Sequence, residues 1–334
     1  MKALGTLEEL PADYRAALAR QSISPLWPQM RNLLPSQWPA GPTRACHWSY
    51  AAIRPLLLEA GRLTPVEKAE RRVLVLADPG RGPDAMQLSA SIYCGLQLLL
   101  PGELAPAHRH TPSAARIVVE GRGAMTVVDG ERCPMEPGDL ILTPGGMWHD
   151  HRHEGSEPVM WLDALDLPLF AYLEGSYSQE PGQVEPGGTA LGMRDPHTLR
   201  QRYPRLRFAW SEMRARLLDS AAQQPHAGTG EIDYRHPVTG ESCLPTLGFT
   251  AMHLQAGSRS APARKSMSAA FHVVEGTGRT RVDDRTFAWT RGDTFSTPVF
   301  ASIEHQAADE DAFLICIHDR PLQEKLGFYE ERAA

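Results

Sequence analysis

The sequence predicts a mainly β protein with two related β-barrel domains, a helical arm before them and a helical linker between them. The 334-residue chain contains 28 glycines and 28 prolines, which separate many short apolar and β-branched runs. This pattern is typical of turn-rich β proteins. Residues 246–318 also repeat the spaced glycines, prolines and acidic residues of residues 88–170, at an offset of about 155 residues. The repeat indicates a duplicated barrel.

The order of the patterns divides the chain into four parts. Residues 1–85 contain a polar helical pattern, a second helical pattern and a short strand, and form the arm and helical region. Residues 86–170 form the first barrel, which begins with a strand near Ser91 and closes with a strand near Asp163. Residues 171–245 form the linker, in which Trp210, Met213 and Leu217 recur at helical spacing. Residues 246–334 form the second barrel and the tail.

Charge and composition exclude several classes of partner. The formal net charge is −6, which disfavours nucleic acid and anionic membranes as partners. The sequence has no apolar run long enough to cross a bilayer, and its first residues lack the apolar centre of a signal peptide. Five widely spaced cysteines without a C-x-x-C pair fit a reducing compartment. We therefore expect a cytoplasmic protein.

Two closely spaced pairs of histidines indicate a metal site in the first barrel. His108 and His110 are two residues apart, as are His149 and His151. On a strand, side chains two apart share a face, so His108 and His110 point the same way. A second strand that brings His149 opposite them completes a three-histidine site. Neutral imidazole binds zinc, copper, iron and nickel. A single H-x-H pair is common on surfaces, and the combined spacing is what favours a metal site.

The glycines and prolines around these histidines strengthen that interpretation. Gly102 stands six residues before His108, Gly138 stands six before Pro144, and Gly146 stands three before His149. This spacing resembles the two consensus motifs of the cupin superfamily, which implies a double-stranded β-helix. Many cupins carry a glutamate after the H-x-H pair, and here Ala115-Arg116 stand in its place. The resemblance therefore implies an all-histidine triad.

The repeat in residues 246–334 has lost these ligands. Ala263 and Lys265 stand at the H-x-H positions, and Ile303 stands at the position of His149. His305 corresponds to His151. We expect one metal ion per chain, in the first barrel, and a second barrel that serves as a scaffold.

Longer motifs resemble one cupin family, the bicupin gentisate 1,2-dioxygenases, whose relatives cleave salicylate and 1-hydroxy-2-naphthoate. The resemblance covers most of the chain and is carried by runs that include Gly95-Leu96-Gln97, His108-Arg109-His110-Thr111, Trp148-His149-Asp150-His151 and Trp161-Leu162-Asp163. It implies one Fe(II) per chain, held by His108, His110 and His149. It also implies that O2 opens the ring of an aromatic ortho-hydroxy carboxylate, with maleylpyruvate as the product from gentisate. Members of the family are typically homotetramers.

The same resemblance assigns residues around the metal. It implies that Arg116 binds the substrate carboxylate, a role suited to its planar fork, and that His151 hydrogen-bonds substrate and oxygen. Tyr93 stands where many members carry tryptophan, and Gly145-Gly146-Met147 replaces a bulkier run. Both differences concern the shape of the substrate pocket. The residues expected in or near that pocket are Arg72, Tyr93, Gly95, Gln97, Arg116, His151 and Asp163.

Alternative functions follow from the same residues. The same ring cleavage could act on salicylate, a 5-substituted salicylate or 1-hydroxy-2-naphthoate. A cupin isomerase that uses zinc or manganese is a second class, and a non-catalytic protein that binds aromatic acids is a third. Metal analysis and oxygen uptake distinguish these classes.

Overall fold

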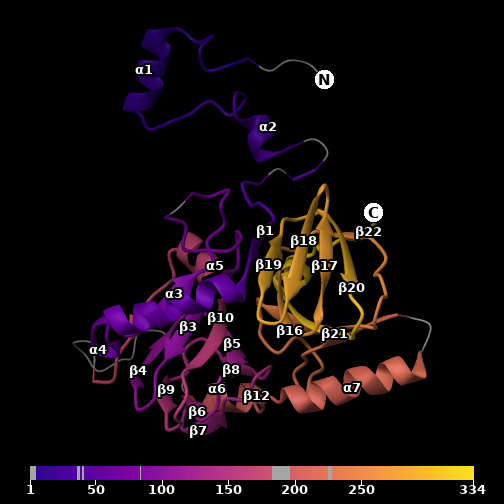
Figure 1. Ribbon diagram of the computed structural model, residues 1–334. Coiled ribbons are helices and arrows are strands. Elements are labelled where there is room, and N and C mark those ends of the chain that lie inside the picture. The colour runs from indigo at the N-terminus through magenta and orange to yellow at the C-terminus, as the bar shows by residue number, and fades with distance from the viewer. Residues whose placement is uncertain (1–4, 36–37, 40, 83, 183–195, 225–227) are drawn as a thin grey trace. The chain divides into compact units, whose positions relative to one another are not determined.

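A computed structural model describes residues 5–35, 38–39, 41–82, 84–182, 196–224 and 228–334 (Figure 1). Its contacts form two compact units, residues 1–42 and residues 43–334. The first unit contains α1 (Ala12–Arg20) and α2 (Met30–Leu33). Neither helix has a buried residue, which matches the polar helical arm expected from the sequence.

The first barrel consists of two sheets that face each other. One sheet has the strand order β12-β8-β5-β10-β3-β2, and the other has the order β11-β4-β9-β6-β7. The strands of the first sheet are β2 (Arg72–Val75), β3 (Tyr93–Leu99), β5 (Ala114–Glu120), β8 (Leu140–Thr143), β10 (Val159–Leu165) and β12 (Arg207–Phe208). Those of the second sheet are β4 (Leu104–His110), β6 (Ala124–Val128), β7 (Glu131–Pro134), β9 (His149–His153) and β11 (Ser178–Gln179).

The second barrel repeats this arrangement, with strand orders β1-β19-β16-β21-β14-β13 and β18-β17-β20-β15-β22. Its first sheet contains β1 (Cys46–Trp48), β13 (Thr229–Asp233), β14 (Gly248–Leu254), β16 (Ala269–Glu275), β19 (Thr294–Thr297) and β21 (Ala312–His318). Its second sheet contains β15 (Ala263–Lys265), β17 (Thr277–Val282), β18 (Arg285–Thr290), β20 (Ser302–Ala307) and β22 (Glu331–Ala333). Figure 1 shows most strands of the first barrel in purple to magenta and most strands of the second in orange to yellow, with the indigo β1 beside β19. The predicted mainly β bicupin architecture is confirmed.

Strand register shows that the two barrels are equivalent in detail. His108 pairs with His149 between β4 and β9, and Ala263 pairs with Ile303 between β15 and β20. The pairs β10/β5 and β21/β16 each contain a register shift, one beside Trp161 and the other between Val273 and Glu275. The repeat seen in the sequence is therefore a repeat of backbone geometry as well.

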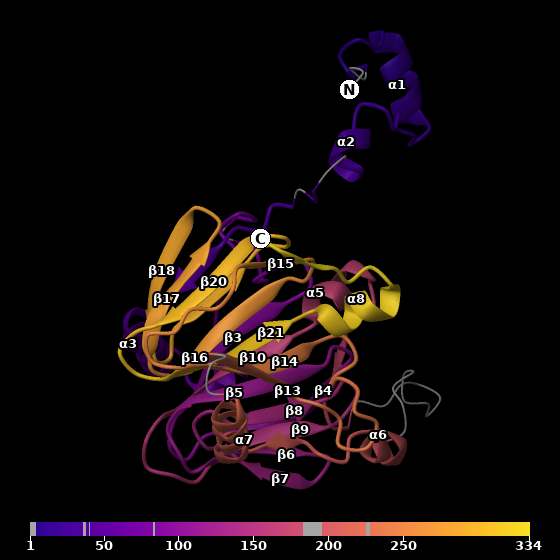
Figure 2. The ribbon, with the colours of Figure 1, turned by 90° about the vertical axis from the view of Figure 1, so that its right-hand side faces the viewer.

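Helices cover the sheets and join them. α3 (Tyr50–Leu63) contacts β2 and β3, and α7 (Trp210–Gln223) contacts β13 and β14. Figure 2 shows α7 nearly end-on. α7 buries the predicted stripe of Trp210, Met213 and Leu217. The remaining helices of the second unit are α4 (Val66–Ala69), α5 (Leu167–Tyr172), α6 (Pro196–Arg202) and α8 (Arg320–Leu326). Among the described helices, none combines the length and apolar character required to cross a bilayer.

One apolar cluster spans the two barrels, and a separate cluster lies within the second barrel. A continuous cluster of buried side chains joins first-barrel residues such as Leu162 to Phe249 and Phe313 of the second barrel, and it includes Trp210 of the linker helix. Residues 43–334 accordingly form one compact unit. The four-part division from the sequence stays a prediction, and part of the predicted linker, residues 183–195 and 225–227, lies outside the described residues.

Candidate metal centre and substrate pocket

The three predicted ligands come together inside the first barrel. His108 and His110 lie on β4, and the neighbouring strand β9 places His149 directly opposite His108. One ring nitrogen from each residue lies within 4.8 Å of the others. The ring centroids are 4.2 Å apart for His108 and His149 and 4.9 Å apart for His110 and His149. This spacing suits three nitrogens that converge on one ion.

Backbone carbonyls fix the orientation of two of these rings. The Nδ1 atom of His110 lies 2.7 Å from the carbonyl oxygen of Pro112, and that of His149 lies 3.0 Å from the carbonyl oxygen of Met147. Each Nδ1–H donates to its carbonyl, so each Nε2 presents a lone pair. The Nε2 atom of His149 is buried and has no hydrogen-bond partner among the described residues. Because buried polar atoms rarely lack a partner, a bound metal ion fits this donor set.

Burial keeps these histidines neutral. Loss of water around the ring is the main cause that lowers the pKa of His110 to about 4 and the pKa of His149 well below its usual value. The cationic side chain of Arg116 lowers both further. Neutral imidazole is the form that binds a metal. The triad is therefore in its ligand form at neutral pH.

His151 lies next to the triad with one nitrogen unused. Its ring centroid is 6.1 Å from that of His149 and 5.1 Å from the ring of Trp161. The Nδ1 atom lies 3.0 Å from the hydroxyl oxygen of Thr126, whereas the buried Nε2 has no hydrogen-bond partner among the described residues. The Thr126 contact fixes the ring and leaves Nε2 available to a ligand.

Arg116 and Asp163 form a buried ion pair. They are directly opposite each other on β5 and β10, and Arg116 Nε lies 3.2 Å from Asp163 Oδ1. Arg116 also donates to the hydroxyl of Thr143 at 2.8 Å. Burial raises the pKa of Asp163, and the charge of Arg116 opposes that shift. A buried aspartate requires such a partner, so its placement in an apolar run of the sequence is explained by Arg116.

The strand β3 brings Tyr93, Gly95 and Gln97 to one face. These residues alternate along the strand, and Gly95 and Gln97 pair with Val75 and Val73 of β2. A Cβ atom on Gly95 would lie 2.4 Å from Cγ1 of Val73. Glycine at position 95 therefore leaves room for the side chain of Val73.

The adjacent arginines Arg71 and Arg72 have different partners. Arg72 is buried, donates to the carbonyl oxygen of Gly61 at 3.4 Å and pairs with Glu103. Arg71 is the residue that points the other way: its guanidinium donates to the carbonyl oxygen of Pro106 at 2.7 Å and contacts the ring of His108. Sequence reasoning missed Arg71. Side chains alternate along a strand, so Arg71 shares a side with Val73 and Val75, which pair with Gln97 and Gly95. This alternation was the signal in the sequence that could have identified Arg71.

The fold and the triad define a metal-binding cupin protein, and comparisons narrow this class. The cupin domain family matches residues 95–165. A gentisate 1,2-dioxygenase of Ralstonia sp is 48% identical over 341 residues, which cover 98% of this chain and 96% of that protein. A 5-aminosalicylate 1,2-dioxygenase of Comamonas sp is 34% identical, over 95% of this chain and 88% of that protein.

A solved structure agrees with these relatives. The salicylate 1,2-dioxygenase of Pseudaminobacter salicylatoxidans superposes with a TM-score of 0.88 at 30% identity, over 99% of each chain. The chain belongs to the gentisate 1,2-dioxygenase family of bicupin dioxygenases. The members are oxidoreductases that incorporate both atoms of O2.

Proposed function

We propose that this protein uses O2 and one Fe(II) per chain to open the ring of gentisate between C1 and C2, giving maleylpyruvate. The observation that carries the proposal is the triad of His108, His110 and His149, of which His149 is buried, together with the buried side chains of Arg116 on β5 and His151 on β9. The 48% identity to a gentisate 1,2-dioxygenase over almost the whole chain supports the choice of substrate.

The donor set suits a divalent redox metal. Three neutral imidazoles cancel none of the charge of the ion, so an anionic substrate binds beside it with a large electrostatic gain. When bound, iron supplies the one-electron chemistry that lets triplet O2 react with a closed-shell ring.

Charge balance around the triad favours a carboxylate substrate. Arg71 and Arg116 are cationic, Asp163 is the anion paired with Arg116, and the histidines are neutral. The pocket therefore has an excess of positive charge before substrate arrives. Asp163 and Thr143 hold the guanidinium of Arg116 through Nε and Nη1, and its remaining N–H groups can donate to a substrate carboxylate.

His151 is proposed to act on the hydroxyl side of the substrate. Its buried Nε2 is free among the described residues, and Thr126 holds the ring from the opposite nitrogen. A neutral imidazole in this position can hold or move a proton at Nε2 as the hydroxyl binds and the ring opens.

Salicylates are the second candidate substrates. Relatives that cover 86% or more of this chain are named 5-aminosalicylate 1,2-dioxygenase and 1-hydroxy-2-naphthoate 1,2-dioxygenase. We propose that Tyr93 and Gly145-Gly146, which differ from the usual family residues, shape part of the substrate pocket. We further propose a homotetramer in the cytoplasm, with the metal-free second barrel available as an interface.

Oxygen uptake tests the proposal directly. Purified protein loaded anaerobically with Fe(II) is mixed with gentisate, salicylate, 5-aminosalicylate or 1-hydroxy-2-naphthoate, and consumption of O2 is followed with an electrode. We expect the highest kcat/KM with gentisate and both atoms of ¹⁸O2 in the product. Faster turnover of another substrate would change the substrate alone, whereas no uptake with any of the four would refute the proposed function.

A further inference from the structure

The second barrel contains a cavity at the place that corresponds to the metal centre. The cavity measures about 580 Å³, including its open mouth. Its lining includes Ala263, Lys265 and Ile303, the counterparts of the three metal ligands, and His305, the counterpart of His151. Phe271 and Cys316, opposite each other in register, occupy the positions of Arg116 and Asp163. The second barrel has therefore retained the cavity of the first, but different side chains line it.

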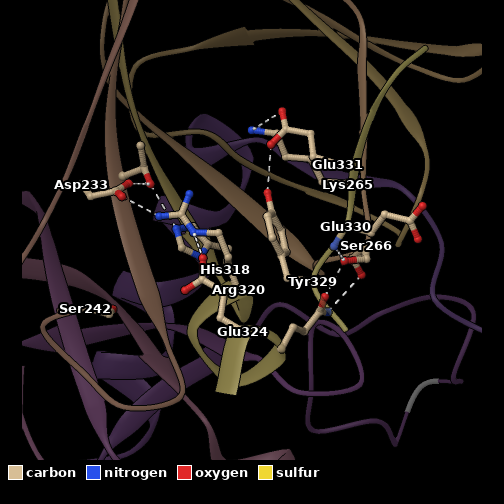
Figure 3. A network of polar contacts seen from close by, with 12 residues as sticks. Asp233, Ser242, Lys265, Ser266, His318, Arg320, Glu324, Tyr329, Glu330 and Glu331 are labelled. Atoms are coloured by element: carbon tan, nitrogen blue, oxygen red, sulfur yellow. Dashed lines mark hydrogen bonds and ion pairs between the residues drawn. The ribbon is translucent and has the colours of Figure 1, made fainter. Parts of the chain in front are cut away.

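A lysine supplies the positive charge that the metal supplies in the first barrel. Lys265 stands at the position of His110, and its Nζ atom lies 3.6 Å from Oε1 of Glu331, directly opposite on β22 (Figure 3). The Glu331 side chain is 48% exposed and also accepts a hydrogen bond from the hydroxyl of Tyr329. An ion pair this long and this exposed contributes little stability. A ligand carboxylate can therefore replace Glu331 as the partner of Lys265.

The other charged groups at the cavity leave Lys265 as the available cation. Arg320 is bound to Asp233 at 2.5 Å and lies 3.5 Å from Glu324 (Figure 3). Glu231 is exposed at the lining. Asp233 and Glu324 neutralise Arg320, and Glu231 adds negative charge, so a ligand carboxylate has to bind at Lys265.

His305 offers a hydrogen-bonding nitrogen inside the cavity. Trp289 Nε1 donates to the hydroxyl oxygen of Thr280 at 2.9 Å, and that hydroxyl lies 2.8 Å from His305 Nδ1. The Thr280–His305 pair repeats the Thr126–His151 pair of the first barrel. No described residue hydrogen-bonds Nε2 of His305, although the side chain is almost fully buried. Burial lowers the pKa of His305 to about 4, so the ring is neutral and adds no second charge.

The remaining wall is apolar and aromatic. Met252 and Met267 line it, and Phe271 stacks on Phe295 at 5.1 Å and meets His305 at 4.7 Å. Methionine sulfur and aromatic edges make favourable contacts with an aromatic ring.

We propose that the second barrel is a metal-independent binding site for a small aromatic monocarboxylate, with the carboxylate on Lys265 and a polar substituent or carboxylate oxygen on His305. The site is separate from the metal centre, and the proposal does not depend on the reaction catalysed there.

Benzoate analogues test this site on the full-length protein. In crystals soaked with 4-bromobenzoate, we expect an anomalous bromine peak within the second barrel, between Phe271 and Met252, with the carboxylate on Lys265. In calorimetric titrations with benzoate, Lys265→Met should lose one binding equivalent per chain or bind at that site about tenfold more weakly. Lys265→Arg should restore binding.

Two further variants control for charge and for folding. Arg264→Met removes a neighbouring positive charge that is paired with Asp283 outside the cavity, and should bind benzoate as wild type does. Ala263→Phe fills the cavity and keeps the lysine, and should lose the same equivalent as Lys265→Met. Metal content should be unchanged in all four variants. Absence of bromine from the second barrel, or wild-type binding by both Lys265→Met and Ala263→Phe, would overturn the proposal.

Discussion

Asp166 and Asp319 occupy equivalent positions in the two repeats, and each carboxylate bonds to a hydroxyl group of the other barrel. Asp166 binds the hydroxyl of Thr246, and Asp319 accepts from the hydroxyl of Ser91 at 2.5 Å. Each aspartate also accepts a backbone N–H from its own barrel. The two barrels are thus joined by a reciprocal pair of polar contacts around the shared core. A duplicated barrel forms this arrangement when its two copies face each other with approximate twofold symmetry.

These carboxyl groups predict a pH dependence of stability. Burial raises the pKa of both Asp166 and Asp319 to about 6. The folded state then holds more protons than the unfolded state between about pH 4 and pH 6, so their contribution to stability falls as the pH rises through that window. Asp319→Asn removes a titrating carboxyl group, so its contribution to this fall in stability with rising pH should disappear. In urea unfolding, the stability of wild type relative to Asp319→Asn should decrease from pH 4 to pH 7. A constant difference over this range would contradict the assignment.

Metal binding should depend on the first barrel alone. His149→Ala removes a buried ligand of the triad, and should abolish both the bound iron and turnover, because two histidines hold the ion too weakly. His305→Ala removes a buried histidine of the second barrel, where the position of His149 is occupied by Ile303, and should retain one iron per chain and wild-type turnover. Inductively coupled plasma mass spectrometry gives the stoichiometry. Two iron ions per wild-type chain would refute a single site.

Arg116 should govern affinity for the substrate carboxylate. Lysine retains the charge but loses the planar fork, so Arg116→Lys should weaken substrate binding by about 1.5–3 kcal/mol, the range for hydrogen bonds to charged groups. Iron content should remain normal. Anaerobic titration of the iron-loaded protein with gentisate measures this directly. Wild-type affinity in Arg116→Ala would place the carboxylate elsewhere.

Arg71 and Arg72 provide a matched pair of adjacent arginines. Arg71 contacts His108, so Arg71→Met should lower kcat/KM by about tenfold or more, the effect of losing one charged hydrogen bond. Arg72 is buried against Gly61 and Glu103, so Arg72→Met should lower the melting temperature and leave KM near the wild-type value. The reverse result would show that Arg72, and not Arg71, acts in the substrate pocket.

The side chain of Val73 over Gly95 predicts a compensating pair of substitutions. Gly95→Ala places a methyl group 2.4 Å from Cγ1 of Val73, and should destabilise the fold by about 1–3 kcal/mol. Val73→Ala removes that contact and should recover part of the loss in the double variant. Thermal unfolding of the single and double variants measures the coupling. Full additivity would show that the strand separation adjusts without strain.

The sequence by itself determined the architecture and the metal ligands. The repeated glycines and prolines identified two barrels, because a turn of fixed geometry needs the same residue types wherever it occurs. The spacing of His108, His110 and His149 identified the triad, because side chains two apart on a strand share a face. The loss of ligands at Ala263, Lys265 and Ile303 similarly indicated that the second barrel holds no equivalent triad.

Strand register and long-range packing, which only the tertiary structure shows, decided the contacts around the metal centre and between the barrels. The choice between Arg71 and Arg72 depends on which residues of β2 lie opposite Gln97 and Gly95, and one residue of slip would exchange them. The pairing of Asp163 with Arg116, and of Asp319 with Ser91, joins residues far apart in the chain. β1, from residues 46–48, joins the second barrel although it precedes the first. No local pattern encodes these contacts, because they arise only when the free energy of burying both barrels against each other selects one arrangement.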